Sequence, residues 1–353
     1  MRDQSRITET LLGWYDRCAR KMPWRGIRNS YRIWVSEIML QQTRVETVIP
    51  YYERFLSRFP SLPDLAAAQE ADVLKMWEGL GYYSRARNLL KGSRQVMEQY
   101  GGILPDQPAL LRKISGIGPY TAGAIASIAY NIPVPAVDGN VIRVYSRLFG
   151  IRENVLLPAV RKEIEDTAAA IVPLDRPGDY NQAVMDLGAT VCVPGTPDCA
   201  RCPLSGFCDA FACGDAPDLP LIPGKAPQKV LRWTIPVLRS GNRTLVRQRT
   251  ETLLQGLWCF PMLECELPEA PAVLENRFHF HTVAAGSALH AHHVFTHLSW
   301  DMDVLPLDTA PDAAAPPDYH WIAADELDSF VFPAAMNAAL GEARRLLASP
   351  VSF

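Results

Sequence analysis

The sequence lacks any long apolar segment. No run of about 18 uncharged apolar residues occurs in its 353 residues, so we expect no membrane-spanning helix. The first residues, MRDQSRITETLLGW, carry charges and lack the apolar centre of a secretory signal peptide. Low-complexity tracts and clear internal repeats are also missing. A globular chain of this length favours two domains.

A strong positive charge is missing as well. The net charge of −3, taken alone, argues against a nucleic-acid partner. Residues 1–213, however, hold 25 Lys and Arg against 22 Asp and Glu, a net of +3, whereas residues 214–353 hold 10 against 16, a net of −6. The first part can therefore present a weakly basic face, and we expect the two parts to have different tasks.

Four of the eight cysteines lie in one short, loop-rich segment. Cys192, Cys199, Cys202 and Cys208 form the pattern C-x6-C-x2-C-x5-C. Four thiolates suit zinc or an iron–sulfur cluster, and the uneven spacing favours a cubane cluster. A segment without metal is a third interpretation. Thiols in a ligand pattern indicate a reducing compartment rather than disulfide bonds.

The two parts of the chain differ in apolar periodicity. Up to about residue 190, apolar residues recur at helical spacing, and the short breaks between them hold glycine and proline, which predicts a mostly α-helical domain over residues 1–213. Residues 214–230 contain four prolines and predict a stiff, extended linker. Beyond the linker the period changes to two, as in Leu298–Val304, and a helix is expected at about 334–347. Residues 231–353 therefore predict a small α+β domain.

A glycine-rich turn between two helical segments is a candidate contact with a phosphate backbone. Gly116 and Gly118 lie in ISGIGPYTA, and Pro119 suits the first turn of the next helix. Both glycines can adopt positive φ, so backbone N–H groups and the helix N-terminus can face one phosphate. A plain tight turn is the alternative. A helix–hairpin–helix over about residues 107–130 would grip DNA without reading its bases.

Two carboxylates are candidates for chemistry on a glycosidic bond. Asp138, in VDGN, can cap the following helix and would lie near the sugar of a nucleotide held by the hairpin. There it can stabilise positive charge at C1′, or attack that carbon. Glu37 lies in IWVSEIML, which is apolar nearly all round, so burial would raise its pKa and let it deliver a proton. A plain helix cap and a solvated helix edge are the simpler interpretations of these two residues.

Two loops could help to open a duplex. Gln-Gln-Thr at 41–43 directly follows the Glu37 segment, and residues 79–83 form a glycine-flanked aromatic tip. Amide and aromatic side chains on loops can fill the gap left by an extruded base. For Tyr82 or Tyr83 a contact in the core is the alternative.

Together these motifs resemble the helix–hairpin–helix DNA glycosylases and, among them, the adenine DNA glycosylases of the MutY type. The resemblance covers nearly all of residues 20–210 and continues more weakly to the C-terminus. It is carried by MPWR at 22–25, SEIMLQQT at 36–43, the aromatic tip, the hairpin, VDGN at 137–140 and the four cysteines.

The resemblance implies a base-flipping enzyme that removes adenine mispaired with 8-oxoguanine, or with guanine, from duplex DNA. Glu37 would protonate the departing adenine, and Asp138 would stabilise an oxocarbenium-like sugar. Supporting residues would be Tyr120 and Asn140. The pocket for adenine would be lined by Trp24, Arg25, Leu40 and Gln182. The residues around 8-oxoguanine would be Gln42, Thr43, Leu80 and Tyr82. The four cysteines would hold a [4Fe-4S] cluster.

The same resemblance implies that residues 231–353 form a Nudix-like 8-oxoguanine-recognition domain. The Nudix box GxxxxxE…REuxEE is missing there, so we expect no nucleotide pyrophosphohydrolysis. Phe295, Thr296 and His297 match the loop that contacts 8-oxoguanine, where the family often has serine in the middle. Threonine keeps that hydroxyl and adds a methyl group.

Tyr120 stands where bifunctional relatives of the endonuclease III type carry a Schiff-base lysine, so we expect a monofunctional glycosylase. Thymine glycosylases acting on G·T also have tyrosine there, but usually lack a second domain. The carboxylate pair argues against a damage sensor without catalysis, and the hairpin argues against an electron carrier. We expect a monomer in the cytoplasm of a bacterium, associated with the nucleoid through DNA.

Overall fold

The computed structural model describes residues 4–224 and 228–349. Contacts divide the chain into two units, one of residues 1–70 and 85–225, the other of residues 71–84 and 226–353. Each unit has hydrophobic core clusters of its own. In the described part of the chain, no helix is both long enough and apolar enough to cross a membrane.

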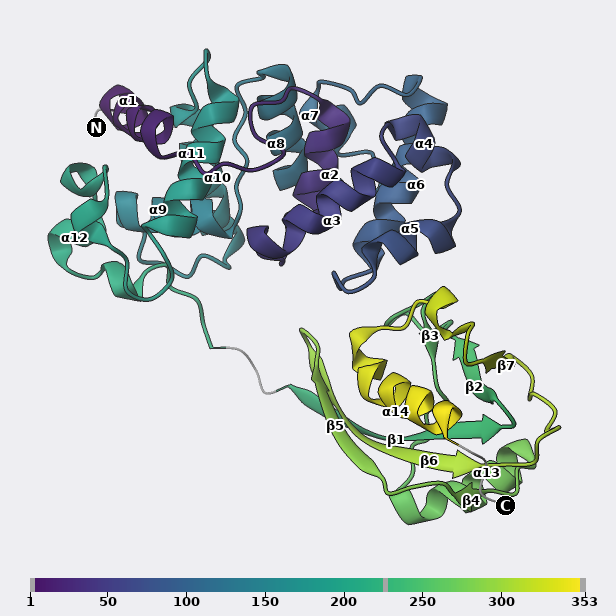
Figure 1. The fold of residues 1–353 in the computed structure, drawn as a ribbon. Helices are drawn as coiled ribbons and strands as arrows, with labels where there is room; N and C mark the ends of the chain where they lie inside the picture. The colour runs from purple at the N-terminus through teal and green to yellow at the C-terminus, as the bar shows by residue number, and fades with distance from the viewer. Residues whose placement is uncertain (1–3, 225–227, 350–353) are drawn as a thin grey trace. The chain divides into compact units, whose positions relative to one another are not determined.

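The first unit is built from helices (Figure 1). They are α1 (Gln4–Cys18), α2 (Ser30–Leu40), α3 (Val45–Arg58), α4 (Leu62–Ala67), α6 (Ser84–Tyr100), α7 (Pro108–Leu111), α8 (Pro119–Tyr130), α9 (Gly139–Phe149), α10 (Pro158–Ile171), α11 (Pro177–Thr190) and α12 (Asp209–Cys213). The cysteine segment between α11 and α12 holds only two 3-10 turns, Cys199–Arg201 and Ser205–Phe207. The mostly helical fold predicted for this part is confirmed.

Two groups of helices meet in this unit. Helices α1, α9, α10 and α11 share a core that includes Ile7, Tyr145, Ile164 and Leu187. Helix α2 packs against α3 and α8, and α11 contacts both α8 and α9. Helix α8 is made mostly of small apolar residues and is buried almost all round, so neighbouring helices can approach it closely. Helix α11 therefore joins the two groups.

The second unit contains α5 (Glu70–Trp77) and a mixed sheet. Its strands are β1 (Lys229–Ser240), β2 (Arg243–Gln248), β3 (Trp258–Cys259), β4 (Val283–Ala284), β5 (Leu289–Val294), β6 (Leu298–Asp308) and β7 (Tyr319–Ala323). Strands β1 and β6 pair in parallel from Lys229↔Leu298 to Arg239↔Asp308, and the other paired strands are antiparallel. The expected α+β fold is confirmed, and its predicted strand is β6.

Helices cover both faces of this sheet. Val237 of β1 belongs to the cluster that contains residues of α14 (Asn337–Ala348), whereas its neighbour Leu238 belongs to the cluster that contains residues of α13 (Ala270–Phe278). Because successive side chains of a strand point to opposite faces, the two helices lie on opposite sides of β1. This explains why β1 is buried continuously from Thr234 to Ser240, without alternation.

The first part of the predicted linker packs onto the first unit. Leu219 is buried, and the main-chain N–H of Val155 donates to the carbonyl of Leu221 at 3.2 Å. A 3-10 turn, Ala216–Asp218, precedes this contact. Residues 225–227 of the linker lie outside the described residues.

Candidate active site

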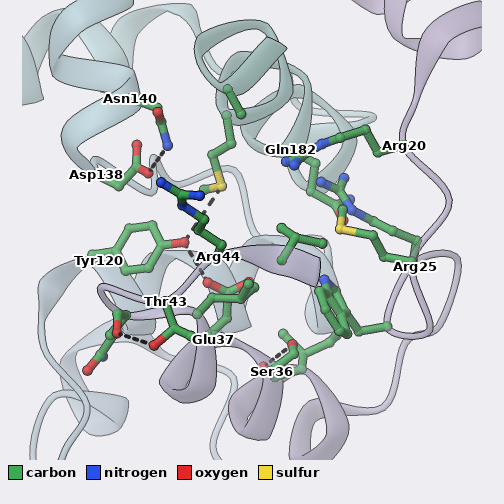
Figure 2. A pocket seen from close by; sticks show the side chains of 18 of the residues that line it. Arg20, Arg25, Ser36, Glu37, Thr43, Arg44, Tyr120, Asp138, Asn140 and Gln182 are labelled. Atoms are coloured by element: carbon green, nitrogen blue, oxygen red, sulfur yellow. Dashed lines mark hydrogen bonds between the residues drawn. The ribbon is translucent and has the colours of Figure 1, made fainter. Parts of the chain in front are cut away.

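A cavity of about 660 Å³ lies in the first unit, among α2, α8, α9 and α11 (Figure 2). It lies where the two groups of helices meet. Its lining brings together these sequence-predicted residues: Trp24, Arg25, Glu37, Leu40, Gln42, Thr43, Tyr120, Asp138, Asn140 and Gln182. It also includes Ser36 and Gln41, which belong to the motif at 36–43, and Arg20, Arg44, Glu46 and Met185, for which no role is expected from the sequence.

Glu37 projects from α2 into the cavity. The helix begins after Asn29, whose side chain accepts a hydrogen bond from the main-chain N–H of Arg32 at 2.9 Å. The Glu37 side chain is buried, with 6% of its residue surface exposed, and its Oε2 accepts a hydrogen bond from the Tyr120 hydroxyl at 2.5 Å. Burial raises the pKa of Glu37, while the Tyr120 hydrogen bond and the charge of Arg25 oppose that rise. The solvated-edge interpretation is therefore wrong.

Tyr120 lies in the first turn of α8, a helix that packs against α2, and its hydroxyl reaches Glu37 from there. Burial, together with the neighbouring negative charge of Glu37, raises the pKa of Tyr120 well above its ordinary value. The phenol therefore remains protonated at neutral pH and can act as a hydrogen-bond donor to the Glu37 carboxyl group.

Asp138 is the N-cap of α9, as its sequence context predicts. Its Oδ1 accepts the main-chain N–H of Val141 at 2.8 Å, and its Oδ2 accepts the side-chain amide of Asn140 at 2.7 Å. Burial raises the pKa of Asp138, but these hydrogen bonds and the charge of Arg143 act in the opposite direction. Because Asp138 accepts from N–H donors at a helix N-terminus, its surroundings favour the ionised carboxylate more strongly than those of Glu37 do.

Helix α9 also connects Asp138 with the cysteine segment. Arg143 donates to Asn140 Oδ1 at 2.8 Å, to the carbonyl of Gly188 at 2.7 Å and to the carbonyl of Cys192 at 2.8 Å. One turn further along, the buried Arg147 donates to Cys192 Sγ at 3.3 Å. Because Gly188 and Cys192 are about 45 to 50 residues away from these arginines along the chain, no local pattern in the sequence indicates these contacts.

The four predicted thiols surround one cavity. Cys192, Cys199, Cys202 and Cys208 are all partly buried and line this cavity together with residues that include Arg147. Over residues 4–224 and 228–349, no three His, Cys, Asp or Glu side chains are grouped closely enough to hold a single metal ion. The thiols thus share a space without converging on one point.

The predicted hairpin joins α7 to α8. Gly116 has φ of +82°, and a Cβ atom there would lie 3.0 Å from Cβ of Asn88, so both backbone conformation and space favour glycine. The expectation of positive φ is wrong at Gly118, where φ is −85°. Gly118 is the N-cap of α8, and N-cap residues take an extended conformation.

The remaining predicted residues belong to the second unit. Leu80 is buried, whereas Tyr82 has φ of +48° and is 48% exposed. The Tyr82 hydroxyl lies 3.0 Å from Oγ1 of Thr296, in the exposed turn between β5 and β6. His297 follows in this turn, and the Phe295 ring packs edge-on against another aromatic ring. The core alternative applies to Tyr83, which is buried, and not to Tyr82.

Comparison with known proteins agrees with this geometry. The profile of HhH-GPD superfamily base excision DNA repair proteins matches residues 35–173, and that of the NUDIX domain matches residues 234–342. A solved thermostable thymine-DNA glycosylase has a TM-score of 0.55 and 28% identity, covering 60% of this chain and 97% of its own. The fold and cavity therefore define a DNA glycosylase of the helix–hairpin–helix class.

Sequence relatives identify the family within that class. The adenine DNA glycosylase of Mus musculus is 35% identical, covering 95% of this chain and 77% of its own, and that of Arabidopsis thaliana is 38% identical, covering 84% and 56%. The chain belongs to the adenine DNA glycosylase family, as its motifs predict.

Proposed function

We propose that the protein hydrolyses the N-glycosidic bond of adenine opposite 8-oxoguanine, or opposite guanine, in duplex DNA. The observation that carries this proposal is the shared cavity of Glu37 and Asp138, one buried beside a phenol and the other capped by N–H donors. Two carboxyl groups in different environments are suited to acid-assisted cleavage of a glycosidic bond. A base must leave the stack to reach such a cavity, so the reaction requires base flipping.

In the proposed reaction, the protonated Glu37 gives its proton to a ring nitrogen of the flipped adenine. The electrons of the C1′–N bond leave with the base, so the base departs neutral and positive charge develops on the sugar. The ionised Asp138 stabilises that charge. Water then adds to C1′ and gives a proton to the Glu37 carboxylate, which restores the acid.

The lining of the cavity supports a monofunctional reaction. Tyr120 occupies the first turn of α8, and the described residues of the lining include arginines but no lysine. An imine with the sugar requires a deprotonated amine, and a guanidinium group stays protonated at all physiological pH values. We therefore propose base release without a coupled strand-cleaving lyase step.

We propose that Cys192, Cys199, Cys202 and Cys208 hold a [4Fe-4S] cluster. Their shared cavity suits a polynuclear group, and the Arg147 guanidinium at Cys192 Sγ can offset part of the negative charge of four thiolates. The cluster would fix the conformation of this loop-rich segment. Iron and sulfide assays with an absorption spectrum test this assignment, and serine at Cys199 should abolish the iron-linked absorption.

For the base opposite adenine, we propose that the turn containing Phe295, Thr296 and His297 and the tip containing Tyr82 contact 8-oxoguanine. The 3.0 Å approach of the Tyr82 and Thr296 hydroxyls supports this proposal, because it joins two polar groups beside an exposed aromatic ring. Leu80, Gln42 and Thr43 are proposed to support the gap at that base.

Single-turnover base release tests the proposed function. Three duplexes should be compared, with adenine opposite 8-oxoguanine, adenine opposite guanine, and thymine opposite guanine. We expect release from the first two and none from the third. Release of thymine alone would favour the thymine glycosylase alternative, and binding without release from any duplex would favour a damage sensor.

A further inference from the structure

One wall of the active-site cavity carries two positive charges that share one carboxylate. Arg20 and Arg25 both line the cavity and lie beside Gln182 in Figure 2. Asp186, one helical turn beyond Gln182 on α11, accepts from Arg20 Nη2 at 2.6 Å and from Arg25 Nη2 at 2.9 Å through the same oxygen, Oδ1. Its other oxygen, Oδ2, accepts the main-chain N–H of Arg20 at 3.3 Å.

Asp186 does not itself face the cavity. Its surface is 0% exposed, and it lies behind the two arginines rather than in the lining. Arg25 is held from a second side by Tyr15, whose hydroxyl accepts from Nη1. A buried carboxylate with two guanidinium partners holds both in fixed positions, because leaving either charge unpaired in a buried site is costly.

We propose that Asp186 is a positioning residue for the glycosylase reaction, which fixes Arg20 and Arg25 at the cavity wall and offsets part of their charge. The inference rests on the proposed function of the same cavity. Two guanidinium groups and one carboxylate leave a net charge of +1 at this wall. Removing the carboxylate would leave +2 and release the Arg25 side chain from one of its two anchors.

The charge at this wall acts on the proposed acid. Burial raises the pKa of Glu37, and the positive charge of Arg25 lowers it. The charged and titratable groups of the surrounding elements are Arg20 and Arg25 before α2, Arg44 and Glu46 after it, Arg85 on α6, Tyr120 on α8, Asp138 before α9, and Asp186 on α11. Of these, Asp186 is the group whose loss adds positive charge to the wall without changing the lining itself.

The test is Asp186→Asn in the full-length protein, which keeps the shape and removes the charge. Because the acid must be protonated, activity is present below the pKa of Glu37 and lost as pH rises through it. We expect the high-pH limb of single-turnover adenine release to move to lower pH by about one unit, with about tenfold slower release on that limb. Binding of a duplex with a non-cleavable nucleotide should remain close to that of the wild type. An unshifted limb in a folded variant would overturn the proposal.

Further variants keep the test decisive. Asp16→Asn also removes a carboxylate partner of an arginine, Arg176 at 2.6 Å. Because Arg176 does not line the cavity, the high-pH limb of this variant should stay in place. Arg25→Gln removes positive charge and should move the limb to higher pH, which tests the charge argument even if Asp186→Asn fails to fold. If the high-pH limb of Arg25→Gln stays where it is in the wild type, the charge argument is contradicted. Wild-type protein that releases no adenine would instead refute the proposed function.

Discussion

The two carboxylates of the cavity lie on different groups of helices and are held in different ways. Glu37 belongs to the interior of α2, has mostly apolar neighbours on that helix and accepts a hydrogen bond from the Tyr120 hydroxyl. Asp138 stands at the start of α9 and accepts from a main-chain N–H and an amide. The comparison teaches that environment can favour different protonation states of the same functional group, and the proposed roles of acid and anion depend on that difference.

Replacing Glu37 by Gln should have the largest effect. The amide has nearly the same shape but no transferable acidic proton, so we expect single-turnover adenine release to fall by about 10³-fold or more, with duplex binding retained. Glu46→Gln is the matched control, since Glu46 lines the same cavity but is exposed. Its rate should stay within a few-fold of the wild type. Comparable losses in both variants would show that burial does not distinguish the two glutamates.

Replacing Asp138 by Asn should have the next largest effect, about 10²-fold to 10³-fold on base release, because a neutral amide cannot offset positive charge on the sugar. Asparagine is a good N-cap, so thermal stability should be nearly unchanged. Asp138→Ala should lose the same activity and also about 1 kcal/mol of folding stability. Near-normal activity in Asp138→Asn together with a loss in Asp138→Ala would show that Asp138 acts only as a helix cap.

Much of this contrast could be predicted from the sequence. The apolar surroundings of Glu37 and the helix-start pattern at Asp138 are local signals, and both predictions of environment are confirmed. The partners that hold the site were not predictable in this way. Asp186 reaches Arg20 across 166 residues, and only the packing of α11 brings them together. The exact backbone of the hairpin is not predictable from its glycines either, because a glycine at a helix cap, such as Gly118, does not need positive φ.

Tyr120→Phe should have a smaller effect, about tenfold on base release. The change removes the donor to Glu37 and little volume, so the acid loses orientation but remains in place. Because that hydrogen bond lowers the pKa of Glu37, its loss should move the high-pH limb of the rate to higher pH. A rate profile measured from about pH 5 to pH 9 checks both effects. A limb that moves to lower pH would contradict the assigned direction of the hydrogen bond.

The smallest effect is expected in the second unit. Thr296→Ala should reduce the preference for adenine opposite 8-oxoguanine over adenine opposite guanine by a few-fold, since it removes one hydroxyl contact. Thr296→Ser keeps the hydroxyl and serves as the control. An equal loss with both duplexes would indicate a general effect on DNA binding instead of recognition of the damaged base.

The most direct measurement of the central claim is the pH dependence of single-turnover adenine release by the wild-type protein. A protonated Glu37 and an ionised Asp138 predict a bell-shaped profile: activity falls at low pH as Asp138 gains a proton, and falls at high pH as Glu37 loses one. The high-pH limb should lie above the ordinary pKa of a glutamate and should vanish from the residual activity of Glu37→Gln. A rate that rises continuously with pH, or a limb that persists unchanged in Glu37→Gln, would contradict the account.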